Sequence, residues 1–101
     1  MSDELVLSEP EGTIVVPAAT LARIVAHAAE RVEGANVRRP RRSVEVDVAG
    51  GSATVALQLT AAYGSVLPAL AEAVQRETVE ALEAMCGLEA REVDVAIEEL
   101  V

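Results

Sequence analysis

The chain has 101 residues, a formal net charge of −9 and eight basic residues, all of them Arg. A chain of this length forms one domain that buries roughly 60–65% of its unfolded surface, so its core needs no disulfide or metal. About half of the residues (51%) are hydrophobic, but Phe and Trp are absent and Tyr63 is the only aromatic. Such a composition favours thin layers of small aliphatic side chains and disfavours a deep ligand cavity.

Targeting and membrane signals are weak. The longest apolar stretch, residues 14–22, is interrupted by Pro17 and Thr20 and is far shorter than the ~18 residues of a membrane span. The acidic N-terminus lacks the basic start and apolar core of a signal peptide. The expected location is therefore the cytoplasm.

Residues 1–11 are acidic, contain Pro10 and show no clean period, so we expect a mobile lead-in before a single domain over residues 12–101. Gly12 opens a short β-branched strand, TIVV. Pro17 suits the first position of the helix that follows, and Gly34 suits its C-terminal stop. The apolar stripe of this helix consists of Leu21, Ile24, Val25, Ala28 and Val32.

A β-hairpin is predicted next. Residues 44–48 alternate apolar and acidic side chains, AGGS at 49–52 provides a tight glycine turn, and residues 52–60 alternate again. The side chains expected to face the core are Val44, Val46, Val48, Val55, Leu57 and Leu59.

The longest predicted helix runs from Val66 to Cys86, with Ser65 as its N-cap. Gly87 followed by Leu88 is typical of a helix stop with a left-handed glycine. Val79 is an apolar residue on the otherwise polar face. The opposite, buried face is predicted to contain Leu67, Leu70, Ala71, Val74, Thr78, Ala81, Leu82 and Met85.

A final alternating strand, REVDVAIEELV, completes a β-α-β-β-α-β order. This order predicts a two-layer α+β domain, with two helices on one face of a mostly antiparallel four-stranded sheet. A ferredoxin-like strand order is the first interpretation, and a related wedge with a marginal first strand is the alternative. The outward face of the sheet is expected to be acidic, with Glu45, Asp47, Asp94 and Glu98.

The residues give little support for enzymatic chemistry. His27 is the only histidine and lies on the predicted polar face of a helix. Cys86 lies at a helix C-terminus, where the helix dipole opposes a thiolate. One His and one Cys cannot form a clustered zinc site, and no glycine-rich loop opens a helix to bind phosphate. We therefore predict no catalytic residues, no metal and no cofactor.

The segment NVRRPRR concentrates four of the eight basic residues, Arg38, Arg39, Arg41 and Arg42. Three interpretations remain open: a solvated loop, a docking site for an acidic protein surface, and a nucleic-acid contact. The negative net charge and the lack of aromatic side chains for base stacking disfavour nucleic acid. A small nucleic-acid-binding module is kept as the alternative function.

Several motifs carry a family resemblance in this order: GTIVVP before the first helix, ERVEG at its end, AYGSV before the second helix, AVQRETVEALEAMCGL within it, and the final VDVAI. Together, over residues 12–101, they resemble the alkaline shock protein family, also called the envelope stress response family, of Gram-positive and related bacteria. The Arg segment is not part of the shared pattern. Tyr63 and Gly64 match the family's turn, where we expect Gly64 to permit a sharp chain exit and Tyr63 to pack with a hydroxyl partner.

The resemblance implies an abundant cytoplasmic, non-enzymatic protein linked to envelope or alkaline stress. In that family, membrane proximity comes from a membrane-anchored partner and from self-assembly. Because the chain carries both signs of charge in separate groups, our hypothesis is a weak homo-oligomer in which the four Arg residues contact the acidic sheet face of another copy. Val79 and Ala96 are the apolar residues expected to add to that contact.

Overall fold

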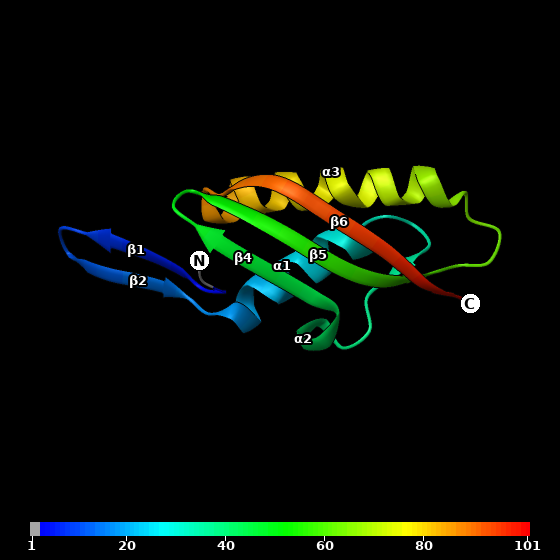
Figure 1. The fold of residues 1–101 in the computed structure, drawn as a ribbon, viewed down its shortest axis with the longest axis horizontal. Coiled ribbons are helices and arrows are strands. Elements are labelled where there is room, and N and C mark those ends of the chain that lie inside the picture. The colour runs from blue at the N-terminus through cyan, green and yellow to red at the C-terminus, as the bar shows by residue number, and fades with distance from the viewer. Residues whose placement is uncertain (1–2) are drawn as a thin grey trace.

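The computed structural model describes residues 3–101 and confirms the two-layer α+β architecture (Figure 1). Helices α1 (Ala18–Glu30) and α3 (Leu67–Cys86) form one layer and a four-stranded sheet forms the other. A separate hairpin of β1 (Leu5–Glu9) and β2 (Gly12–Val16) extends from one end of the sheet. Because of this extension, the molecule measures 51 × 21 × 20 Å.

Strand β5 (Ser52–Ala61) lies at the centre of the sheet. Strands β4 (Val44–Ala49) and β3 (Ala35–Asn36) pair with it in antiparallel fashion, whereas β6 (Glu89–Leu100) pairs with it in parallel. The parallel pairing follows from α3, which carries the chain back to the start of β5 before β6 begins. In a ferredoxin-like order the first predicted strand would lie between β5 and β6. Here β6 occupies that position, so the sheet has the wedge-like arrangement.

The strand predicted at residues 12–16 is present, but its partner is β1. Leu5 pairs with Val16 and Leu7 with Ile14, and a two-residue turn joins the strands. Residues 5–9 of the segment expected to be a lead-in therefore form a strand. Leu5 explains why this strand holds its place, since it is 3% exposed within the core of the domain. Residues 1 and 2 of the predicted lead-in lie outside the described residues.

The core lies between the helices and the inward face of the sheet. The predicted hairpin is confirmed, and its inward Val and Leu residues are buried as expected. Met85 is an exception on α3, because it was predicted to be buried and is 68% exposed. The largest fully buried side chains are Leu21, Val25, Val55, Leu57, Leu59, Val74, Thr78, Leu82 and Leu88.

The ends of the helices agree only in part with the sequence. Gly87 has φ 66° and its amide donates to the Glu83 carbonyl, which confirms the left-handed stop of α3. Ser65 is not the N-cap, since that position is Val66. Gly34 is not the stop of α1 either, because the helix ends at Glu30.

Gly34 has a different role at the crossing of two loops. It has φ 94°, and its carbonyl accepts a hydrogen bond of 2.8 Å from the Ala62 amide. A Cβ atom at this position would lie 2.9 Å from the Ser65 hydroxyl oxygen. The positive φ favours glycine at this position, and a side chain here would also displace the Ser65 hydroxyl where the loop after α1 meets the loop before α3.

Candidate interaction surface

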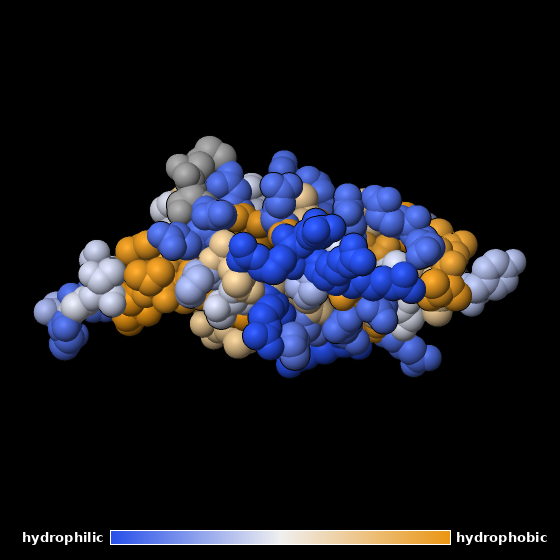
Figure 2. Space-filling model, turned by 90° about the horizontal axis from the view of Figure 1, so that it is seen from below, coloured by the Kyte–Doolittle hydropathy of each residue, from blue (hydrophilic) through white to orange (hydrophobic). Residues whose placement is uncertain are grey.

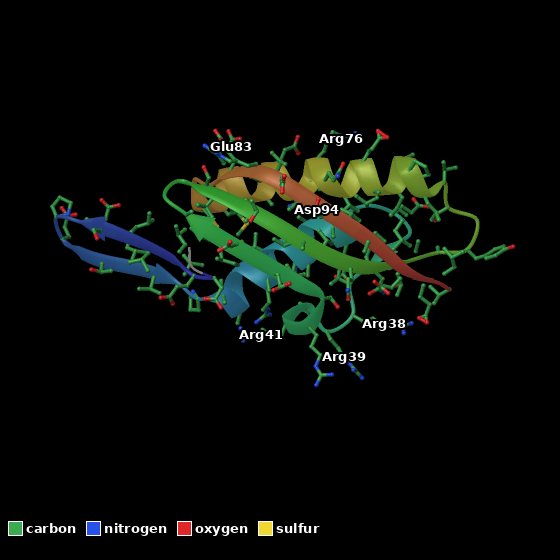
Figure 3. All side chains as sticks on the ribbon, in the orientation of Figure 1. Arg38, Arg39, Arg41, Arg76, Glu83 and Asp94 are labelled. Carbon is green, nitrogen blue, oxygen red and sulfur yellow. The ribbon has the colours of Figure 1, made fainter. Side chains whose placement is uncertain are left out.

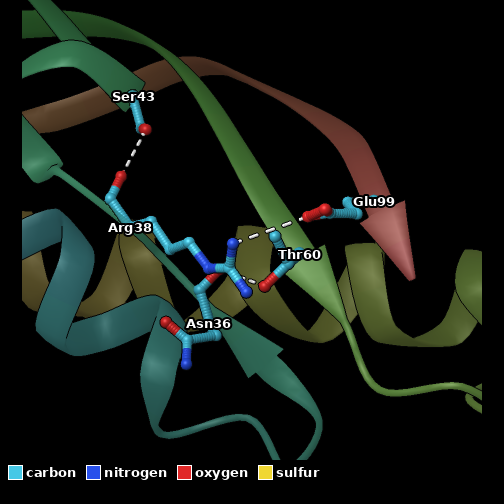
Figure 4. A network of polar contacts seen from close by, with 5 residues as sticks. All are labelled: Asn36, Arg38, Ser43, Thr60 and Glu99. Carbon is cyan, nitrogen blue, oxygen red and sulfur yellow. Dashed lines mark hydrogen bonds and ion pairs between the residues drawn. The ribbon is translucent and has the colours of Figure 1, made fainter. Parts of the chain in front are cut away.

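The Arg segment is an anchored turn with a fixed path. Val37 is buried, and its amide donates to the Glu30 carboxylate at 3.1 Å. On the other side of the turn, the Ser43 hydroxyl donates to the Arg38 carbonyl at 2.6 Å (Figure 4). These contacts hold both ends of the segment against the domain, so its backbone follows a defined path.

The turn contains a short helix that the sequence did not predict, α2 (Pro40–Ser43). Its start is explained by Pro40, whose fixed φ suits a first helical position, and by Arg39, which has φ 50°. Arg38 forms an ion pair of 3.6 Å with Glu99. Figure 3 shows Arg39 pointing away from the body of the protein. We call Arg38, Arg39, Arg41 and Arg42 the basic turn.

The carboxylates on the outward face of the sheet form two adjacent rows. In one row Glu45 and Asp94 flank Ala56, and in the next row Asp47 and Glu92 flank Thr54. Glu92 was missed from the sequence, although it lies two positions before Asp94 and continues the same alternation. We call Glu45, Asp47, Glu92 and Asp94 the acidic face.

Glu98 does not belong to the acidic face. It lies at an irregularity where the register of β5 and β6 shifts, between the pairs formed by Ile97 and Glu99. It is four residues beyond Asp94, which corresponds to about 13 Å along a strand. Glu98 is exposed but lies apart from these two rows, so its place in a contact with the other carboxylates remains a prediction.

The basic turn and the acidic face adjoin each other on one side of the molecule. A shallow cavity of about 440 Å³ is lined by Arg41 together with all four carboxylates of the acidic face. A neighbouring cavity of about 210 Å³ is lined by Arg42, Glu45 and Asp94. Among residues 3–101, neither arginine forms an ion pair with these carboxylates. Opposite charges therefore line the same cavities without forming direct ion pairs within residues 3–101.

The apolar residues expected to support this contact differ in exposure. Ala96 is exposed and lines the smaller cavity beside Arg42. Val79 is half-buried and packs against the core, so less of it is available to a partner than the sequence suggested. Its part in binding remains a prediction.

The predicted turn before α3 is exposed. Tyr63 is 83% exposed, so the expected packing of its ring is wrong. Backbone contacts hold the turn in place, since the Tyr63 amide donates to the Val101 carbonyl at 2.6 Å. Gly64 has φ 97° and permits the sharp exit that was expected of it.

The side chains considered for chemistry lie apart from one another. His27 is exposed on α1, whereas Cys86 is half-buried at the end of α3 and packs against the core. Burial raises the pKa of the Cys86 thiol, which disfavours the reactive thiolate. Within residues 3–101 there is no cluster of three or more potential metal-ligating side chains of His, Cys, Asp or Glu. No helix in the same range has the length and apolar character needed to cross a bilayer.

Comparison with protein-family models gives a match over residues 35–101 to the alkaline shock protein family, described as having a cell envelope-related function. The match covers the sheet, α2 and α3 but not the β1–β2 hairpin or α1. It is the family that the sequence motifs resemble. Comparisons with curated proteins and with solved structures give no significant match.

Proposed function

The chain belongs to the alkaline shock protein family of cell envelope-related proteins, and on this basis we propose that it is a non-enzymatic, self-associating interaction module of the envelope stress response. It acts in the cytoplasm and is held near the membrane by a membrane-anchored protein partner. Its own surface supports the self-association part of this proposal.

The observation that carries the proposal is the adjacency of the basic turn and the acidic face. When two patches of opposite charge lie side by side on one surface, a second copy turned by 180° places each patch on its complement. The contact is then isologous and closes as a dimer. The shallow shape of the cavities between Arg41, Arg42 and the carboxylates suits such a face-to-face contact.

The expected association is weak. Exposed ion pairs contribute about 0–1 kcal/mol each, and salt screens them. Arg38 contributes least, since it already pairs with Glu99 within its own chain. Charge therefore orients the two copies, and apolar contacts are needed for a stable assembly.

The structure disfavours the alternative of a nucleic-acid-binding module. Phosphates approaching Arg41 or Arg42 would meet the carboxylates of Glu45 and Asp94, which line the same cavities. The α2 helix has four residues, and Tyr63 lies in a separate turn, away from α2 in the chain. Tyr63 is the only aromatic side chain of the sequence, so the protein lacks the several rings on which single-strand binders stack successive bases.

The test is a pull-down from native lysate, with membranes present, of the tagged chain in cells that also produce an untagged copy. We expect recovery of the untagged copy with and without ribonuclease and deoxyribonuclease, and a loss of recovery when Arg38, Arg39, Arg41 and Arg42 are all changed to Ser. Replacing Arg76 and Arg91 by Ser is the control, because both are exposed and lie outside the basic turn. Recovery that depends on intact nucleic acid would support the alternative and contradict the proposal.

A further inference from the structure

The β1–β2 hairpin has apolar side chains on both faces that its own chain leaves uncovered. Figure 2 shows hydrophobic residues along this hairpin, next to the polar surface around α2. Exposed apolar patches of this kind mark interaction sites in soluble proteins. The residues concerned are Val6 (50% exposed), Leu7 (37%), Ile14 (50%) and Val15 (49%).

One face of the hairpin is continuous with the core. At its base Leu5 and Val16 pack against the domain, and Leu7 and Ile14 continue the same face towards the tip. The hairpin extends away from the domain along the long axis of the molecule (Figure 1), and on this part of the face Leu7 and Ile14 are exposed. A two-stranded hairpin is only marginally stable in water without a surface to pack on.

A matching surface lies between the two long helices. Residues of α1 and α3 line a groove of about 410 Å³. Its apolar lining includes Ile24 and Ala28 from α1, and Ala81 and the exposed Met85 from α3. The sequence had placed Met85 in the core, so this groove was not visible from the sequence.

The remaining lining of the groove is mainly basic. Arg23 and His27 of α1 and Arg31 at its C-cap follow one another beside the apolar residues. Of these three side chains, Arg31 alone forms an ion pair within residues 3–101, at 3.7 Å from the Glu77 carboxylate. The tip of the β1–β2 hairpin carries the opposite charge, with Glu9 and Glu11 on either side of Pro10.

We propose that the β1–β2 hairpin of one copy docks into the α1–α3 groove of a second copy. Leu7 and Ile14 would lie on the apolar lining of the groove, and the glutamates of the tip would lie near its arginines. The dimensions allow this contact, because the three steps from Leu7 to Pro10 in the turn span about 10 Å, whereas the eleven steps from Thr20 to Arg31 along the groove span about 17 Å.

This inference rests on the proposed self-association and adds a second, partly apolar contact, because the groove lies on the helix layer and the acidic face lies on the sheet. The hairpin and the groove are different surfaces, so the contact is heterologous. Two copies that exchange hairpins form a closed dimer, whereas one-way docking extends into a chain.

The test is a complementation experiment followed by sedimentation velocity. Ile14→Ser removes the apolar hairpin contact and leaves the groove intact, and Met85→Glu does the reverse. Each variant alone is expected to associate at least tenfold more weakly than wild type. An equimolar mixture is expected to form heterodimers, because it combines an intact hairpin with an intact groove. Val66→Ser is the control, since Val66 is 70% exposed but belongs to neither surface.

The outcomes separate this inference from the proposed function. If the wild type self-associates and Ile14→Ser and Met85→Glu associate equally well, the hairpin contact is wrong and the self-association stands. If the wild type is a monomer at every concentration, both are wrong. Circular dichroism checks the fold of each variant. If either variant is misfolded, Glu11→Arg and Arg23→Glu replace the pair, with weak association separately and recovery in the mixture as the expected result.

Discussion

Two glycines have nearly the same backbone angle but different surroundings, and they separate backbone strain from packing. Gly34 has φ 94° and Gly64 has φ 97°, so a side chain at either position is strained to a similar degree. A Cβ at Gly34 would lie 2.9 Å from the Ser65 oxygen, whereas no atom lies within 4 Å of one at Gly64. A side chain at either glycine lowers the free energy of unfolding. The difference between the two losses therefore measures the contact between the two loops.

We predict that Gly34→Ala lowers the free energy of unfolding by about 1 kcal/mol more than Gly64→Ala does. Urea denaturation of both variants gives the two values. Adding Ser65→Ala to Gly34→Ala should recover part of the loss, because it removes the oxygen in the way. Equal costs at the two glycines would show that the loops do not depend on this close approach.

The sequence predicted which residues have a positive φ angle better than it predicted which residues they contact. Gly87 and Gly64 have the positive φ angles expected of them, since glycine is the residue that adopts this conformation freely. The roles of Gly34, Ser65 and Tyr63 depend on contacts between distant loops. Such contacts leave no local pattern in the sequence, so those three predictions were wrong.

Helix α3 contains one polar group that does not fit its buried stripe. Thr78 is 0% exposed, and its hydroxyl has no hydrogen-bond partner in the part of the chain that the structure describes. A buried hydroxyl without a partner costs about 1–3 kcal/mol, and Val has a similar shape and helix propensity. Thr78→Val should therefore raise the free energy of unfolding by about 1 kcal/mol.

The comparison variant for Thr78 is Thr60→Val. Thr60 is 8% exposed, but its hydroxyl donates to the Asn36 carbonyl at 3.4 Å, so this substitution should be neutral or destabilising. Thermal or urea unfolding of both variants provides the test. A loss of stability in Thr78→Val would mean that its hydroxyl has a partner in solution.

The sequence predicted elements well where their pattern is long and local. The α3 helix and the β4–β5 hairpin were found with their ends nearly correct, because each has a continuous period and a glycine stop or turn. Strand β1 was missed because it is short and flanked by acidic residues and Pro10. The parallel pairing of β5 with β6 was missed because alternation indicates which face is buried and does not identify the neighbouring strand.

The whole molecule combines two kinds of exposed surface. The basic turn and the acidic face lie together on one side, whereas the apolar surface of the β1–β2 hairpin lies at one end. The sequence identified the residues of the basic turn and the acidic face, except for Glu92, because the charge of a side chain follows from its residue type. It did not reveal that the two charged groups adjoin, since that depends on the path of the chain between α1 and β4.

These surfaces respond differently to salt. Contacts between charged patches weaken as ions screen them, while contacts between apolar side chains persist. At about 0.5 M salt the screening length is roughly 4 Å, so pairing between the basic turn and the acidic face is largely lost. The salt dependence of self-association therefore reports on this contact.

The most direct measurement is sedimentation velocity of the wild type and of the variant with Arg38, Arg39, Arg41 and Arg42 changed to Ser, each at about 0.05 M and 0.5 M salt. We predict that the wild type associates at low salt and shifts towards monomer at high salt, and that the variant is already shifted at low salt. The variant with Ser at positions 76 and 91 should behave as wild type. If neither salt nor the four substitutions changes the distribution, the basic turn is only a solvated loop and the central claim is wrong.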